Sequence, residues 1–272
     1  APGHGSDDWE LGIASGIAVP DTVGGDGLYY KDVPIFAGVH VFKADEIVIK
    51  HLKSSGALLA KGKITHSYPH SWRSKAPLIF RNTPQWFISM DSNNLRDTAL
   101  RAIADTAFYP ETGRNRLKGM IETRPDWCVS RQRAWGVPIT VFVNKKNGEI
   151  LRDQDVLNKV IEAVEAEGAD AWFSSDPARF LAPNHNPDEF EQVTDILDVW
   201  FDSGSSHSFV LEQREDLAWP ASLYLEGSDQ HRGWFHSSLL ESCGTRGRAP
   251  YESVLTHGFV MAEDGQKMSK SL

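Results

Sequence analysis

The stretch LYLEGSDQHRGWF, residues 223–235, begins with a short apolar run and continues into an apolar pattern of helical spacing. We expect a strand at Leu223–Leu225 and a helix over Arg232–Cys243 that ends near Gly244. A second strand is expected at Val254–Phe259. A strand, a helix and a second strand in this order are typical of a parallel sheet, and they place the chain in the α/β class.

Polar residues follow the expected ends of these strands. Glu226–Gln230 come directly after the first strand, and Gly258 lies at the end of the second. A further strand of the same sheet is expected at Ile196–Phe201. Because ligands of open α/β sheets bind beyond the carboxyl ends of the strands, we expect both polar segments to share one ligand-binding rim.

Other parts of the chain carry local patterns of the same kind. Glycine and proline mark residues 1–35 as loops that link short strands, and residues 177–187 as a polar connection. Helices are expected at residues 43–54, 95–107, 116–122 and 156–166. Strands are expected at residues 58–61, 78–80, 86–89 and 139–143, the last leading to a turn at Asn147-Gly148. The inner side of the helix at 95–107 is expected to carry Leu95, Ala99 and Ile103.

The composition is that of a folded protein outside the membrane. Of 272 residues, 40% are apolar and nine are tryptophan, and no apolar run reaches the roughly 18 residues that cross a bilayer. The start, APGHGSDD, shows no signal-peptide pattern. Cys128 and Cys243 lie far apart and form neither a disulfide framework nor a CxxC metal site. We therefore expect a reduced, cytoplasmic setting.

The charge of the chain says little about its partners. A net charge of −9 argues against a protein that coats nucleic acid, because phosphate binding favours a basic surface. Residues 114–133 nevertheless hold a dense group of basic side chains. An RNA enzyme with local basic groups therefore remains compatible with the composition.

The pentapeptide Lys267-Met268-Ser269-Lys270-Ser271 is a second informative segment. Its two lysines lie beside Gly265, and ammonium groups on such a stretch can stabilise negative charge that grows on phosphates during a reaction. Lys267 and Lys270 are therefore candidate catalytic residues. Short motifs of this kind also occur by chance in solvated basic loops.

Together these segments resemble class I aminoacyl-tRNA synthetases of the bacterial isoleucyl type. The pentapeptide resembles the lysine loop of that class, and Gly227–His231 is a segment that valyl and leucyl relatives usually lack. Further similar segments run from end to end of the chain: APGHGSDD (1–8), HSYPHSWR (66–73), TPQWF (83–87), RPDWCVSRQRAWGVP (124–138) and DVWFDSG (198–204). The resemblance implies ATP-dependent activation of isoleucine as an adenylate and its transfer to tRNA(Ile). A valyl or leucyl synthetase, and a non-catalytic tRNA-binding module derived from a synthetase, remain alternatives.

The resemblance also implies roles for the rim. The implied adenylate- and amino-acid-binding residues are Glu226, Gly227, Asp229, Gln230, Trp234 and Trp200. Trp234 and Trp200 would wall the isoleucine side chain, although both residues would otherwise be taken as core aromatics. His257 and Gly258 would lie beside the nucleotide, and Lys270 would bind ATP. No general base is implied, because a deprotonated carboxylate is already nucleophilic and needs only positioning and charge stabilisation.

Two domains are implied as well. Residues 1–80 would be the C-terminal part of a β-rich inserted editing domain, and residues 81–272 the second half of a Rossmann-type catalytic domain with an insertion at about 141–195. A pocket for isoleucine rejects valine by only about 1–3 kcal/mol, and isoleucyl-tRNA synthetase is the standard example of this limit. Asp8 would bind the ammonium group of the wrong amino acid during editing. The alternative is that Asp7 and Asp8 cap a helix.

Two features depart from the family pattern. The HIGH-type motif and the threonine-rich editing segment are absent from this sequence, so we expect an internal fragment that does not activate isoleucine by itself. Ser71 and Ser74 occupy a place where some relatives have CxxC, and serine is a poor zinc ligand. No protein-bound metal is therefore expected, and Mg²⁺ would arrive with ATP.

Overall fold

A computed structural model describes residues 5–71, 74–131 and 136–268 of the chain. The chain separates into two compact units, Ala1–Pro84 and Gln85–Leu272. This division lies close to the domain boundary that the sequence suggests after residue 80. Within the described ranges, no helix combines the length and the apolar character that a membrane span requires.

Helices are the regular elements among the described residues of the unit Ala1–Pro84. They are α1 (Ser6–Ala14), the 3₁₀ turn η1 (Val41–Lys43) and α2 (Ala44–Ser54). Helix α2 confirms the helix expected at residues 43–54. Helix α1 lies where loops and short strands were expected, so that expectation is wrong for residues 6–14. Two acidic residues in its first turn, Asp7 and Asp8, favour a helix start because they complement the helix dipole.

The strands expected at residues 58–61 and 78–80 are absent from the described part of this unit. Pairing there is limited to isolated bridges, such as Val23 with Tyr29. Strands need both a paired neighbour and a buried face. Val23 and Ala44 are the only buried apolar side chains among the described residues of the unit, and Leu59 is fully exposed. The β-rich character expected for residues 1–80 is therefore not seen in these residues.

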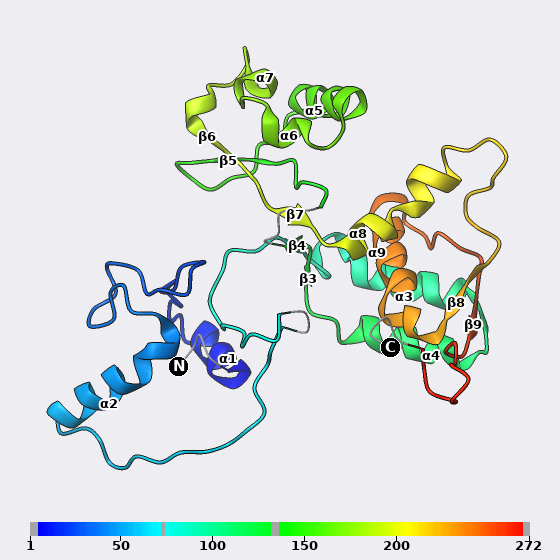
Figure 1. The fold of residues 1–272 in the computed structure, drawn as a ribbon. Helices are drawn as coiled ribbons and strands as arrows, with labels where there is room; N and C mark the ends of the chain where they lie inside the picture. Colours follow the sequence, from blue (N-terminus) through cyan, green and yellow to red (C-terminus); the bar gives the residue numbers. More distant parts are fainter. Residues whose placement is uncertain (1–4, 72–73, 132–135, 269–272) are drawn as a thin grey trace. The chain divides into compact units, whose positions relative to one another are not determined.

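A parallel three-stranded sheet lies in the unit Gln85–Leu272 (Figure 1). Its strands stand in the order β2 (Ala107–Tyr109), β9 (Ser253–His257) and β8 (Tyr224–Gly227), and β9 is parallel to both neighbours. Helix α9 (Trp234–Arg246) connects β8 to β9. The expected strand–helix–strand order is confirmed, whereas β2 lies where the sequence suggested the end of a helix.

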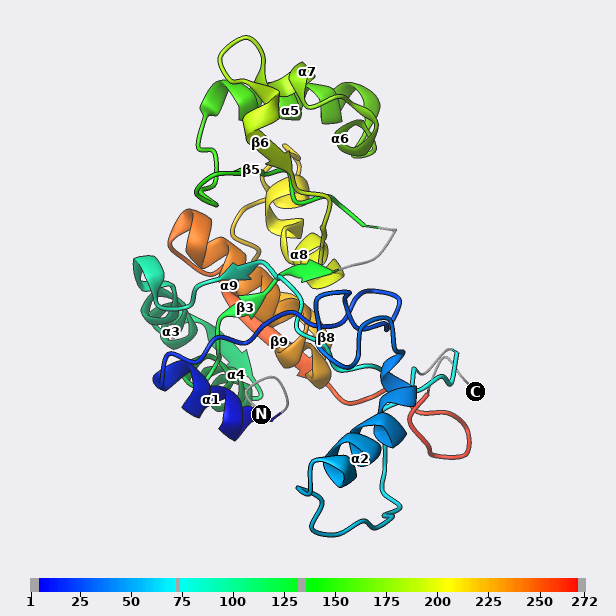
Figure 2. The ribbon, with the colours of Figure 1, turned by 90° about the vertical axis from the view of Figure 1, so that its left-hand side faces the viewer.

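Helices α3 (Leu95–Asp105) and α4 (Thr112–Glu122) share one hydrophobic core with this sheet and α9 (Figure 2). The turn η2 (Ser92–Asn94) precedes α3, and β1 (Phe87–Ile88) pairs antiparallel with β3 (Trp127–Cys128). Leu95, Ala99 and Ile103 are all buried, as the helical spacing predicts. The core thus fixes α9, and with it the end of β8.

The segment after residue 196 differs from the strand expected there. Strand β7 (Ile196–Leu197) pairs antiparallel with β4 (Ser130–Arg131) and does not join the parallel sheet. The Asp198 carboxylate accepts a hydrogen bond from the Trp200 N–H at 3.3 Å and caps helix α8 (Val199–Gly204). A π-helical turn η4 (His207–Leu211) follows. The helix cap, which competes with strand pairing, ends the strand at residue 197.

Helix α9 is longer than expected. Gly244 lies inside the helix, and the chain leaves it at Gly247, where φ is 75°. This left-handed conformation is one that glycine adopts without a steric penalty. The helix therefore ends at the later glycine.

Residues 142–192 form a second small core. Its elements are β5 (Phe142–Asn144), α5 (Gln154–Glu167), α6 (Ala171–Ser174), α7 (Ala178–Leu181), η3 (Pro187–Glu189) and β6 (Phe190–Gln192). Trp172, Phe180 and Leu181 are fully buried here, so the polar connection expected at residues 177–187 is wrong for Ala178–Leu181, which form α7. The turn at Asn147-Gly148 is confirmed by a φ of 72° at Gly148.

Candidate functional site

The rim segment, which we define as Glu226–Trp234, begins at the carboxyl end of β8. The turn η5 (Ser228–Arg232) follows β8 and leads through Gly233 into α9. In the parallel register Gly227 lies opposite His257, the last residue of β9. The two polar segments that the sequence places at one edge of the sheet therefore do meet there.

Two carboxylates, those of Glu226 and Asp229, are exposed at this edge. The Gly227 N–H donates a hydrogen bond to Glu226 Oε2 at 3.3 Å. A Cβ added at Gly227 would lie 2.6 Å from Asp229 Oδ1, so a larger residue there would require the Asp229 side chain to shift. The arrangement can accept hydrogen bonds from an ammonium group or from ribose hydroxyls.

Gln230 has a structural role that the sequence analysis missed. Its Oε1 accepts a hydrogen bond from the Trp234 N–H at 2.9 Å and so satisfies a donor at the start of α9. Gly233 adopts φ −130° and ψ −119°, and a Cβ there would lie 2.5 Å from the same oxygen. Gly233 and Gln230 therefore set the direction in which α9 leaves the rim.

The two tryptophans expected at the site lie near it in different ways. Trp234 is half-buried, stacks on Tyr224 with ring centroids 4.1 Å apart, and donates through Nε1 to the Ser203 carbonyl at 3.0 Å. Trp200 lies on α8 and is 43% exposed. A Cβ at Gly233 would lie 3.0 Å from its ring. Trp200 is therefore not an ordinary core aromatic.

The lysine loop, which we define as residues 258–271, follows β9 directly and is described as far as Met268. Met261 and Lys267 form an antiparallel bridge, and Gly265 has a φ of 76°. Lys267 Nζ lies 3.6 Å from the centroid of the Phe259 ring. The loop therefore holds one ammonium group on an aromatic face close to the rim. Lys270 lies outside the described residues.

His257 and Gly258 are both exposed at the start of this loop. His257 Nδ1–H donates to the Gly258 carbonyl at 2.6 Å. A Cβ added at Gly258 would meet no atom within 4 Å among the described residues. The protein itself therefore does not require glycine at this position, and a role beside a nucleotide stays a prediction.

Buried histidines support the rim from below, and the sequence analysis did not identify them. His231 is 2% exposed, its Nδ1–H donates to the Ser228 carbonyl at 2.7 Å, and a Cβ at Gly113 of α4 would lie 2.8 Å from its Nε2. Burial, together with the positive charges of Arg124 and Arg232, lowers the pKa of His236 to about 3. The only sequence signal was a histidine inside a glycine-flanked segment.

A basic pocket of about 280 Å³ adjoins the rim. Arg124, Arg131, Arg232, Trp200 and His236 are among its lining residues. Arg131 pairs with Asp198 at 2.6 Å. The other two arginines make no ion pair with a described residue. Two of the three arginines come from the basic stretch at residues 114–133.

Asp8 and the serine pair belong to the other unit. Gly5 is the N-cap of α1, and Asp8 lies in its first turn, so Asp8 is not the capping residue. The Ser74 N–H donates to Ser71 Oγ at 3.3 Å, whereas residues 72 and 73 lie outside the described ranges. Across the described residues, no group of three or more His, Cys, Asp or Glu side chains could hold a metal ion.

Comparison with known proteins identifies relatives along the whole chain. A family model described as "tRNA synthetases class I (I, L, M and V)" matches residues 20–272. The chain is 62% identical over 272 residues to the isoleucine–tRNA ligase of Pelagibacter ubique, and 57% identical over 290 residues to that of Caulobacter vibrioides. Both alignments cover 100% of this chain and 30% of the relative. The chain therefore spans about 30% of the length of these ligases.

A solved structure is also similar to this chain. Mycobacterium tuberculosis methionyl-tRNA synthetase bound by methionyl-adenylate is 19% identical, with a TM-score of 0.41, over 77% of this chain and 32% of that chain.

Proposed function

The chain belongs to the class I tRNA synthetases of the I, L, M and V group, and from this membership we propose that it forms part of an isoleucine–tRNA ligase. The full reaction joins isoleucine and ATP into an adenylate and passes the acyl group to tRNA(Ile). The observation that carries the proposal is the pairing of Gly227 with His257 at one rim of the sheet. Glu226 and Asp229 stand there as exposed acceptors. We infer a cytoplasmic location, where this reaction takes place.

At the rim, we propose that Glu226 and Asp229 bind the ammonium group and the ribose hydroxyls of the adenylate. Gln230 keeps its oxygen on the Trp234 N–H, which leaves its amide N–H groups to position the aminoacyl part. Trp200 and Trp234 face the aliphatic side chain. The isoleucine carboxylate attacks the α-phosphate without a general base, so the residues of this chain contribute position and charge.

In the lysine loop, Lys267 and Lys270 act on the phosphates of ATP, which arrive with Mg²⁺. Their ammonium groups stabilise the charge that develops as pyrophosphate leaves. The cation–π contact of Lys267 with Phe259 supports this role, because it keeps the ammonium group near the rim.

For tRNA, we propose that the basic pocket beside the rim contacts the acceptor end. Arg124 and Arg232 offer guanidinium groups to phosphate, and the exposed Trp200 ring offers a face on which a base stacks. This arrangement does not require a basic protein overall, which agrees with the net charge of −9.

We further propose that residues 1–84 are the end of an inserted editing domain and residues 85–272 the second half of the catalytic domain. The observation in favour is that the alignments with isoleucine–tRNA ligases include the first unit. Asp8 then binds the ammonium group of misattached valine.

The proposal is tested in a chimeric ligase in which residues 1–272 replace the corresponding segment of the Pelagibacter ubique ligase. We expect isoleucine-dependent pyrophosphate exchange close to that of the intact relative, and far weaker exchange with valine or leucine. Residues 1–272 alone should show none. A chimera that folds but prefers valine or leucine would identify a different synthetase. A folded chimera that binds tRNA without exchange would favour a non-catalytic module.

The editing role is tested by the paired variants Asp8→Ala and Asp7→Ala in this chimera. Both remove one negative charge from the first turn of α1. Only Asp8→Ala should abolish hydrolysis of valyl-tRNA, while isoleucine activation continues. Equal hydrolysis in the two variants would contradict the assignment of Asp8.

A further inference from the structure

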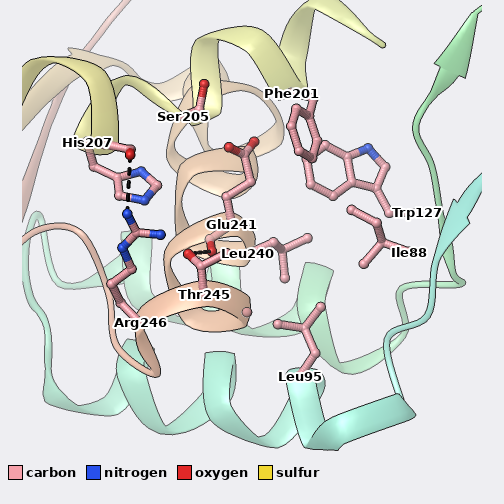
Figure 3. Close-up of a pocket in the computed structure, with 12 residues that line it drawn as sticks. Ile88, Leu95, Trp127, Phe201, Ser205, His207, Leu240, Glu241, Thr245 and Arg246 are labelled. Carbon is pink, nitrogen blue, oxygen red and sulfur yellow. Dashed lines mark hydrogen bonds between the residues drawn. The ribbon is translucent and has the colours of Figure 1, made fainter. Parts of the chain in front are cut away.

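A cavity lies beside the C-terminal half of α9, where Leu240, Glu241 and Arg246 line it (Figure 3). Its volume is about 360 Å³, and α8, α9, β1 and β3 all contribute to its wall. The apolar lining residues are Ile88, Leu95, Trp127, Phe201 and Leu240. A hollow of this size and character accepts a small organic molecule.

A carboxyl group faces this apolar wall. Glu241 is only 9% exposed, and its Oε1 has no hydrogen-bond partner among the described residues. Figure 3 shows the carboxyl group between α9 and α8, with Phe201 and Trp127 on one side and His207 on the other. Burial, and to a smaller extent the neighbouring charge of Asp202, raises the pKa of Glu241 to about 9. At neutral pH the group is therefore a protonated acid.

An imidazole nitrogen lies in the same wall without a partner. His207 is 2% exposed, and its Nδ1–H donates to the Gly204 carbonyl at 3.0 Å. Burial lowers the pKa of His207, so the ring is neutral and Nε2 is an acceptor. This Nε2 is buried and meets no hydrogen-bond donor among the described residues. Glu241 and His207 both line the cavity, and a buried polar atom without a hydrogen-bond partner is a cost that a ligand can relieve.

The other charged groups near the cavity favour a positively charged ligand. Arg246 pairs with Glu212 at 2.7 Å, so its charge is already balanced. Asp202 on α8 adds negative charge beside Glu241, and the Tyr224 hydroxyl on β8 remains neutral because burial raises its pKa. A cation is therefore favoured here over an anion.

We propose that this cavity binds a small apolar amine, whose ammonium group donates hydrogen bonds to the Glu241 carboxylate and to His207 Nε2. The apolar body of the ligand lies against Phe201 and Trp127. The proton balance is simple. The amine keeps its proton and remains an ammonium group. Glu241 releases its proton to the solvent and becomes the carboxylate of the ion pair.

The proposed cavity is separate from the rim. Glu241 follows Trp234 by seven residues on α9, which is about 10 Å along a helix. Helix α8 nevertheless contacts both the rim segment and the cavity, because Trp200 packs on Gly233 and the adjacent Phe201 lines the cavity. Occupation of the cavity can thus act on the rim through α8. The proposal does not depend on the identity of the reaction at the rim.

Calorimetric titration of the 272-residue chain with benzylamine at pH 7.5 tests the proposal. Benzylamine and Glu241 both carry a proton before binding at this pH. Titration in two buffers of different ionisation enthalpy should show one site and release of about one proton per ligand. Benzyl alcohol has the same ring without the charge and should bind at least about tenfold more weakly.

Two variants complete the test. Glu241→Gln keeps the shape and removes the acid, so it should fold, release no proton and bind benzylamine at least about tenfold more weakly. Glu252→Gln changes a carboxylate in the exposed ion pair with Arg248 and should bind like the original chain. The proposal is overturned if benzylamine does not bind, if benzyl alcohol binds equally well, or if Glu241→Gln leaves binding and proton release unchanged.

Discussion

The rim segment and the lysine loop carry neighbouring parts of one proposed site, yet they are held in opposite ways. In the rim segment Gly227, His231 and Gly233 are buried, and the segment is fixed by β8, α4 and α9. In the lysine loop every described residue except Ala262 is exposed. The described part of the loop is held by a few backbone hydrogen bonds, by the hydrogen bond from the Gln266 N–H to Asp264 Oδ1, and by the contact between Lys267 and Phe259.

This difference separates two kinds of contribution. Groups that position a substrate gain from a rigid frame, because small displacements weaken them. An ammonium group that meets growing phosphate charge needs reach more than a fixed geometry. Substitutions in the rim should therefore change stability and function together, whereas substitutions in the loop should change the reaction alone.

The largest effect is expected for the lysines of the loop. Lys267→Ala and Lys270→Ala in the chimeric ligase should each slow adenylate formation by about 10²–10³-fold, because each removes charge stabilisation in the transition state. The KM for isoleucine should stay unchanged, and stability should fall by no more than about 1 kcal/mol, the contribution of the contact between Lys267 and Phe259. Single-turnover adenylate formation and thermal melting measure both effects. A raised KM at an unchanged rate would place the lysines in ground-state binding.

A pH-dependent effect is expected where α9 is buried. The folded pKa of Glu241, about 9, is above its ordinary value of 4.5, so its stability contribution is complete below pH 4.5 and is lost as the pH rises toward 9. The free-energy gap between Glu241→Gln and the original chain should grow by about 2–3 kcal/mol from pH 6 to pH 8.

Urea denaturation at several pH values measures this gap. Glu263→Gln, an exposed position in the lysine loop, is the control and should run parallel to the original chain. If the free energy of unfolding of Glu241→Gln also ran parallel to that of the original chain across the pH range, the buried part of α9 and the loop would not differ in their pH dependence.

A steric effect is expected at the start of α9. Gly233→Ala should lower the free energy of unfolding by about 1–3 kcal/mol, because the new methyl group meets Gln230 Oε1 and the Trp200 ring. Gly244→Ala is the matched variant, since its methyl group meets only Leu95 at an ordinary 3.7 Å. Inside a helix that change should stabilise by about 0.5–1 kcal/mol. Denaturant titration of both variants measures the difference, and equal stabilities would remove the strain argument.

The smallest effect is expected for the aromatic support of the loop. Phe259→Leu removes the ring under Lys267, an exposed cation–π contact that contributes about 0.5–1 kcal/mol. Stability should therefore fall by no more than about 1 kcal/mol. Thermal melting checks this value, and a much larger loss would show that the loop belongs to the folded core.

The local patterns of this sequence were sufficient for several features. The β8–α9–β9 order and the buried side of α3 were predicted from apolar spacing alone. The relation to isoleucine–tRNA ligases was predicted from short segments and is confirmed by relatives up to 62% identical. These features depend on residues that are close in sequence, where spacing and residue type carry the information.

Other features depended on the tertiary structure. No local pattern showed that residues 58–61 would lack a strand partner. Nor did any local pattern show that Asp198 would cap a helix, α8, directly after residue 197. Gln230 as a helix cap and the cavity between Phe201 and Glu241 also appear only when distant segments meet. Burial and pairing are set by residues far away in the chain, so a side chain whose role depends on them cannot be assigned from its neighbours in sequence.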